Sequence, residues 1–217
     1  MPTLPVLVIA CGALGREIVA LRAANAWDHL HLACLPASLH NRPECIPDAL
    51  RQKIRAARAE GYQNIFVAYG DCGTGGQLDA ALEEEGVERI KGAHCYEFFT
   101  GSEAFNALSN VEPGTFYLTD FLARHFESIV VCALGLDRHP DLLPAYFANY
   151  RKLLYLTQTR DDRLLERARM AAKRLGLLFE VRYTGYGGLE DALKTLVQPV
   201  VNPVVNLNFN PMEACHA

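Results

Sequence analysis

Short apolar runs alternate with longer amphipathic segments along most of this chain, and this alternation restricts the possible folds more than any other feature. Three apolar runs rich in Val, Ile and Leu predict buried strands at residues 4–10, 30–35 and 64–69. The segments between them carry apolar residues at helical spacing and predict helices at 13–24, 47–60 and 73–85. Strands without period-two alternation are typical of parallel sheets that are covered on both faces. The sequence therefore predicts an α/β fold with a mostly parallel sheet, helices on both faces and three layers, Rossmann-like in a broad sense.

The second half of the chain repeats this alternation less regularly. Its predicted elements are a short strand at 88–91, helices at 100–108, 118–126 and 140–150, a strand at 153–157, a helix at 161–175, a strand at 178–183 and a helix at 189–196. The apolar run 128–136 fits a strand or a buried helix equally well. We expect one α/β domain over 1–197, or two α/β sublobes at about 1–115 and 116–197. Residues 198–217 have neither period and predict an irregular tail.

Charge and hydropathy exclude several classes of function. The chain has 21 Lys and Arg against 25 Asp and Glu, with a net charge of −4, so it offers no basic field for nucleic acid. No apolar run reaches the roughly 18 residues of a membrane span, and the first ten residues carry no positive charge. We expect a cytoplasmic protein that binds neither nucleic acid nor membrane.

Three of the seven cysteines follow predicted strands, namely Cys11, Cys72 and Cys95. Seven is an odd number, which argues against a disulfide framework. Cys11 and Cys72 also share the pattern C-G-x-x-G at a strand-to-helix junction. In an open parallel sheet, ligands bind beyond the carboxyl ends of the strands, so we expect these three thiols to meet there.

The chemistry of thiols at such junctions favours a metal site. Unpaired N–H groups and the helix dipole lower a thiol pKa, and thiolate is the form that binds metal ions. Cys11, Cys72 and Cys95 are therefore the predicted metal ligands, with zinc as the preferred ion and a [4Fe-4S] cluster on three cysteines as the alternative. The spacing does not choose between them. For Cys34, Cys45 and Cys132 we expect small core side chains instead.

Polar residues near the three cysteines supply the remaining candidates. His40 and His94 are candidates for a fourth ligand or a general acid or base, and Asp71 is the third candidate catalytic residue. The glycine-rich segment 70–76 permits close approach of a ligand, or cradles a phosphate on its N–H groups. It matches neither standard phosphate motif. The candidate cofactor-binding residues are Gly12, Asn41, Gly73, Gly75 and Gly76.

Several of these motifs together resemble a known family. They are ACGAL at 10–14, LHN at 39–41, YGDCG at 69–73, HCYE at 94–97, LTDF at 118–121 and GLDRHP at 135–140. In this order they resemble the DUF1638 family, which has no assigned function, over about residues 6–196. The resemblance implies a setting beside corrinoid-dependent methyl transfer in one-carbon metabolism.

Three functions follow from these observations. The first is a metal-binding protein for methyl-group or thiol chemistry, such as a metal-dependent methyltransferase or lyase acting on a small molecule or with a corrinoid protein. The second is a non-catalytic accessory module for a corrinoid protein or cofactor. The third is a phosphate- or nucleotide-binding enzyme that uses the segment 70–76. A homo-oligomer is compatible with all three.

Overall fold

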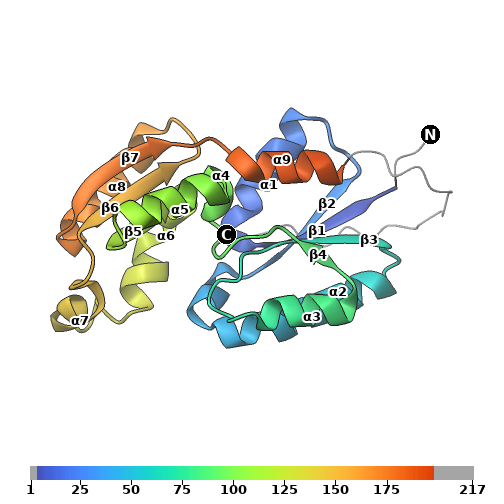
Figure 1. Cartoon of the computed structure of the whole chain (residues 1–217), viewed down its shortest axis with the longest axis horizontal. Helices are drawn as coiled ribbons and strands as arrows, with labels where there is room; N and C mark the ends of the chain where they lie inside the picture. The colour runs from blue at the N-terminus through green and yellow to red at the C-terminus, as the bar shows by residue number, and fades with distance from the viewer. Residues whose placement is uncertain (1–3, 198–217) are drawn as a thin grey trace. The chain divides into compact units, whose positions relative to one another are not determined.

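The structure, a computed structural model, describes residues 4–197 and divides the chain into two compact units (Figure 1). Among the described residues, the first unit comprises 4–95 and 189–197, and the second is Tyr96–Gly188. Both units have parallel strands and helices, so the predicted α/β class is confirmed. The strands form two separate parallel sheets, one in each unit. The predicted tail, 198–217, lies outside the described residues.

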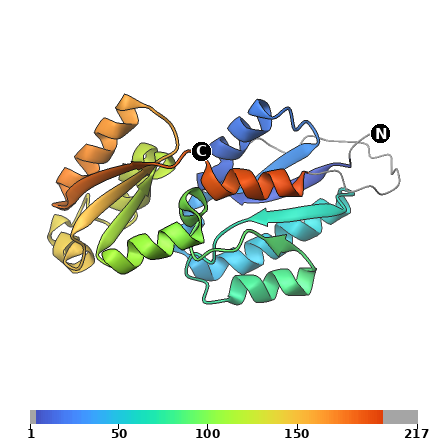
Figure 2. The same ribbon diagram turned by 45° about the horizontal axis from the view of Figure 1, so that its top comes forward.

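The first unit is built on a four-stranded parallel sheet of order β2-β1-β3-β4. Its strands are β1 (Val6–Cys11), β2 (Leu30–Leu35), β3 (Asn64–Ala68) and β4 (Glu88–Arg89). Its helices are α1 (Gly15–Ala24), α2 (Ile46–Ala59), α3 (Gln77–Glu85) and most of α9 (Gly187–Leu196). Figure 2 shows α2 and α3 on one face of the sheet and α1 and α9 on the other. Every residue of β1 is buried, as the sequence predicted for a strand covered on both faces.

The second unit has a three-stranded parallel sheet of order β5-β6-β7. Its strands are β5 (Thr115–Thr119), β6 (Lys152–Thr157) and β7 (Leu178–Tyr183). Its helices are α4 (Glu97–Thr100), α5 (Ser102–Val111), α6 (Asp120–Phe126), α7 (Leu143–Phe147) and α8 (Asp162–Leu175). A cluster of buried side chains from β5, β6, α6 and α8 forms its core, including Leu118, Leu153, Phe126 and Ala168.

One prediction in this unit needs correction, and at a second place the structure decides between a strand and a buried helix. The helix predicted at 118–126 begins only at Asp120, because the preceding residues form β5 and Thr119 caps the helix by accepting a hydrogen bond from Leu122 N at 3.3 Å. The run 128–136 contains no strand. Glu127–Cys132 is one turn of π-helix that buries Val130 and Val131.

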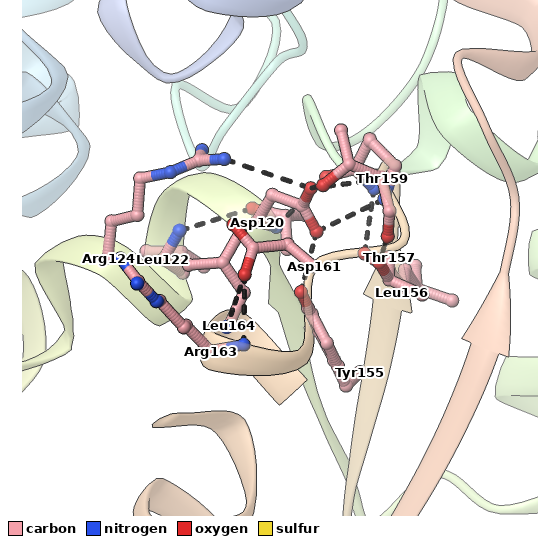
Figure 3. Close-up of polar contacts among 12 residues, drawn as sticks. Asp120, Leu122, Arg124, Tyr155, Leu156, Thr157, Thr159, Asp161, Arg163 and Leu164 are labelled. Carbon is pink, nitrogen blue, oxygen red and sulfur yellow. Dashed lines mark hydrogen bonds and ion pairs between the residues drawn. The ribbon is translucent and has the colours of Figure 1, made fainter. Parts of the chain in front are cut away.

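A buried carboxylate joins the carboxyl ends of β5 and β6 (Figure 3). Asp120 is fully buried and accepts hydrogen bonds from Tyr155 Oη at 2.7 Å, from Gln158 N at 3.1 Å and from Thr159 N at 3.0 Å. The guanidinium of Arg124 lies 3.9 Å from the same carboxylate. Asp120 therefore fixes the loop after β6 against the start of α6.

Within residues 4–197, no helix is both long enough and apolar enough to cross a membrane.

Candidate thiol and metal site

The first unit brings Cys11, Cys72 and Cys95 together at the carboxyl ends of its strands. Cys11 is the last residue of β1, Cys72 follows β3 and Cys95 follows β4. All three are buried free thiols. Cys72 Sγ lies 3.6 Å from Cys95 Sγ, and Cys11 exchanges a hydrogen bond with Cys95. The predicted meeting of these three thiols is therefore present in the structure.

The loops that carry Cys72 and Cys95 are bonded to each other through their backbones. Asp71 N donates to Gly92 O at 3.0 Å, and Cys72 N donates to Ala93 O at 2.8 Å. Gly70 N donates to Cys95 Sγ at 3.4 Å. A Cβ on Gly70 would lie 2.7 Å from the carbonyl carbon of His94, so only glycine allows this close approach.

Cys72 has an unusual backbone conformation for a residue with a side chain. Its φ of 50° places it in the left-handed region, which costs a non-glycine residue of this kind about 1 kcal/mol. The three glycines that follow in this loop, Gly73, Gly75 and Gly76, also have positive φ. This turn directs the Cys72 thiol toward Cys95, and the local strain is held by the hydrogen bonds to residues 92–95.

Hydrogen bonding gives the three thiols different proton affinities. The hydrogen bond from the Cys95 thiol lowers the pKa of Cys72, and hydrogen bonds from His40 and His94 lower it further. Together these bonds outweigh the effect of burial, and the pKa of Cys72 falls to about 3. A hydrogen bond from Cys95 also lowers the pKa of Cys11, against burial. These same bonds raise the pKa of Cys95 well above its usual value. At neutral pH the cluster therefore holds a thiolate at Cys72 and a protonated thiol at Cys95.

Both candidate histidines reach this cluster. His40, in the 3₁₀ segment Ala37–Asn41 after β2, bonds Cys72, and this bond raises the pKa of His40 against burial. His94 also bonds Cys72. Asn41 is exposed at the end of the same 3₁₀ segment. Gly12 lies against the end of β2, where a Cβ would be 3.1 Å from Leu35 O.

Asp71 closes the glycine-rich loop. Its carboxylate accepts hydrogen bonds from Thr74 Oγ1 at 2.5 Å, from Gly75 N at 3.2 Å and from Gly76 N at 3.0 Å. Burial opposes ionisation, but these bonds prevail and lower the pKa of Asp71. The N–H groups that would cradle a phosphate are thus bonded to a carboxylate, which would also repel an anion. The geometry disfavours the phosphate-binding alternative, and the catalytic role of Asp71 stays a prediction.

Arg89 ties the two cysteine loops together and was not among the residues predicted from the sequence. Its Nη1 donates to Tyr69 O at 3.4 Å, to Ile90 O at 2.9 Å and to Gly92 O at 3.2 Å. Its other nitrogens bond both carboxylate oxygens of Asp79 on α3, at 2.6 and 2.8 Å. In the sequence, Arg89 is a positively charged residue inside the short strand predicted at 88–91. Such a residue is equally typical of a solvent-exposed edge strand, so it did not indicate a role in the site.

One family model matches this chain, with the description "Protein of unknown function (DUF1638)", over residues 34–193. The chain belongs to the DUF1638 family. The match includes Cys72, Cys95 and both histidines, and it begins after Cys11. No curated protein and no solved structure matches the chain.

Two further observations complete the site of this DUF1638 protein. Within residues 4–197, no group of three or more His, Cys, Asp or Glu side chains is already spaced as a metal site. Among the other described free cysteines, Cys132 is exposed, so its prediction as a core side chain is wrong. Cys45 is only partly buried.

Proposed function

We propose that this DUF1638 protein binds a metal ion, preferably zinc, through Cys11, Cys72 and Cys95, and acts in methyl-group or thiol chemistry. The observation that supports this is the cluster of three buried, hydrogen-bonded sulfurs, in which the pKa of Cys72 is lowered to about 3. A divalent cation bound by all three sulfurs would offset two of the three negative charges of the thiolates. Buried like charges without such a partner are unfavourable.

The separation between Cys72 Sγ and Cys95 Sγ fits a metal bound by thiolates. Two thiolates that each lie about 2.3 Å from zinc at a tetrahedral angle are about 3.8 Å apart. Cys72 Sγ and Cys95 Sγ are 3.6 Å apart, so small side-chain movements suffice for both to bind one ion. The low pKa of Cys72 means that binding displaces little proton from this ligand at neutral pH.

The neighbouring groups have roles that follow from their contacts. A metal held by three thiolates would supply a Lewis acid for a sulfur, nitrogen or oxygen group of a small substrate. His40 and His94 both contact Cys72, so either one completes the ligand set or holds a proton beside the substrate. Such a protein is a metal-dependent methyltransferase or lyase. The link to corrinoid proteins rests on the family resemblance alone.

The same three cysteines also suit a [4Fe-4S] cluster with one iron open to substrate, which is the alternative cofactor. A non-catalytic accessory protein would contain the same metal and differ by lacking turnover. The identity of the metal distinguishes a zinc site from an iron–sulfur cluster, because iron–sulfur clusters absorb visible light and zinc does not.

Elemental analysis of the untagged protein, purified without oxygen, tests the proposal. We expect equimolar zinc in the wild type, and loss of most of it in Cys72→Ser and Cys95→Ser. Cys132→Ser is the matched control because Cys132 is exposed, and it should keep its metal. Equal metal content in all four proteins, or metal in none, would overturn the proposal. Iron together with visible absorbance would identify the cofactor as the [4Fe-4S] cluster and not zinc.

A further inference from the structure

Strand β7 is an edge of the second sheet, and its side chains are unusually exposed. Among the residues that the structure describes, β6 is its only strand neighbour. Leu178, Val181 and Tyr183 expose 74%, 49% and 55% of their surfaces. An edge strand with exposed apolar side chains and without Pro or a bulge invites pairing with another strand.

The direction of the backbone groups shows which residues are available for such pairing. Leu178 N donates to Arg151 O at 3.1 Å, and Thr184 N donates to Thr157 O at 3.0 Å. In a parallel ladder every second residue directs its N–H and C=O to the same neighbour. Residues 178, 180, 182 and 184 therefore bond β6, and the N–H and C=O groups of Phe179, Val181 and Tyr183 point away from the sheet.

The side chains of β7 are complementary to a second copy of β7. In an antiparallel pair that is symmetric about Val181, each Glu180 lies opposite Arg182 of the other copy, and each Phe179 lies opposite Tyr183. Opposite charges and aromatic pairs at facing positions stabilise a sheet. The charged pairs fall at the positions without hydrogen bonds, where the side chains are closest.

Other symmetric registers are less favourable. Centring the pair on Glu180 places the two Glu180 side chains opposite each other, and centring it on Arg182 does the same with two arginines. Like charges that face each other directly across two strands are destabilising. Like charges thus disfavour both neighbouring registers, and the register about Val181 pairs Glu180 with Arg182 on both sides of its centre.

We propose that this protein dimerises through antiparallel pairing of β7 with β7 of a second copy, centred on Val181. The two three-stranded sheets then become one continuous six-stranded sheet. Every outward N–H and C=O of Phe179, Val181 and Tyr183 gains a partner. This interface is independent of the thiol site, because it involves only residues of the Tyr96–Gly188 unit.

Charge reversal tests the dimer in solution. Sedimentation velocity over a concentration series should show a monomer–dimer equilibrium for the wild type. Glu180→Arg and Arg182→Glu should each weaken it about tenfold, because each creates two like-charge pairs by symmetry. The double variant restores opposite charges between the two copies and should recover most of the lost affinity, although Glu180→Arg replaces the ion pair of Glu180 with Lys152 by a like-charge contact. Arg16→Glu, an equal charge change on the exposed face of α1, should have no effect.

Cross-linking tests the register. Facing Cα atoms of a hydrogen-bonded antiparallel pair are about 5.5 Å apart, within the range of a disulfide. Mild oxidation of Val181→Cys should give a covalent dimer linked through residue 181, and Glu180→Cys should give far less. A wild type that stays monomeric at every concentration, or loss of dimer that the double variant fails to reverse, would overturn the proposal, as would cross-linking at 180 in preference to 181.

Discussion

Cys72 combines a left-handed backbone with a buried thiolate, and both features depend on its neighbours. We predict that metal-free protein keeps a thiolate well below neutral pH, because bonds from Cys95 and the two histidines lower the pKa of Cys72 to about 3. A pH titration of the ultraviolet thiolate absorbance measures this. Cys72→Ser should lose the absorbance that persists in mild acid, and Cys132→Ser should keep it. A wild-type thiolate signal that appears only in alkali would contradict the assignment.

Gly70 is the second residue on which the site depends. We predict that Gly70→Ala destabilises the protein by about 1–3 kcal/mol and reduces metal binding, because the new Cβ would overlap the His94–Cys95 backbone and displace Cys95. Chemical denaturation and elemental analysis measure the two effects. Gly75→Ala is the matched control. It has positive φ but open space for a Cβ, so it should cost about 1 kcal/mol and leave the metal in place.

At the level of elements, the Arg89–Asp79 pair links β4 to α3. The hydrogen bond from Arg89, with its charge, lowers the pKa of Asp79 despite some burial. A carboxylate with a lowered native pKa contributes stability that is present above its unfolded pKa and is lost as pH falls through the native value. We therefore predict that wild-type stability falls in acid and that Asp79→Asn flattens this part of the profile.

Denaturant midpoints measured across the acid range test this prediction. Asp48→Asn is the control, since Asp48 is exposed and forms an ion pair with Arg51 of its own helix. Its acid profile should parallel that of the wild type. An Asp79→Asn profile that also parallels the wild type would show that the pair does not contribute.

The loop contacts of Asp120 lead to a prediction for the second unit. Asp120→Asn removes a fully buried charge that accepts hydrogen bonds from three other residues, and it leaves Arg124 without its carboxylate partner. We predict a loss of about 3 kcal/mol in the free energy of unfolding. Asp161→Ala, which removes only the cap of α8, should cost about 1 kcal/mol. The reverse order of these two losses would contradict a central role for Asp120.

Sequence periodicity predicted those elements whose burial it encodes directly. Helices α2 and α8 each bury one apolar stripe, and β1 is buried throughout, so pattern and structure agree. Strand β5 was missed because its sequence, TFYLT, is short and continues into a helix that shares its apolar character. The π-helical turn at Glu127–Cys132 has no distinct sequence period, so the pattern could not identify it.

For the whole molecule, the sequence predicted the meeting of distant cysteines but not what holds them together. Parallel strands end at the same edge of a sheet, so Cys11, Cys72 and Cys95 could be placed from strand ends alone. Arg89 bonds carbonyl groups whose positions exist only once both loops have folded. The chain passes between the two units twice. The first crossing, at Cys95 and Tyr96, has no Gly- or Pro-rich linker, whereas the return at Gly188 and Leu189 follows the glycine-rich segment 185–188.

The division into two units predicts where metal removal acts. Metal binding stabilises the segments that supply its ligands, so chelation should loosen the unit that carries the cysteines. We predict faster amide hydrogen exchange after chelation in peptides covering 69–76 and 92–95, and unchanged exchange in β5 and β6 of the other unit. Cys72→Ser, treated with the same chelator, should show no response in either unit. Exchange that rises equally in both units, or in neither, would contradict a metal held by these three cysteines as the source of local stability.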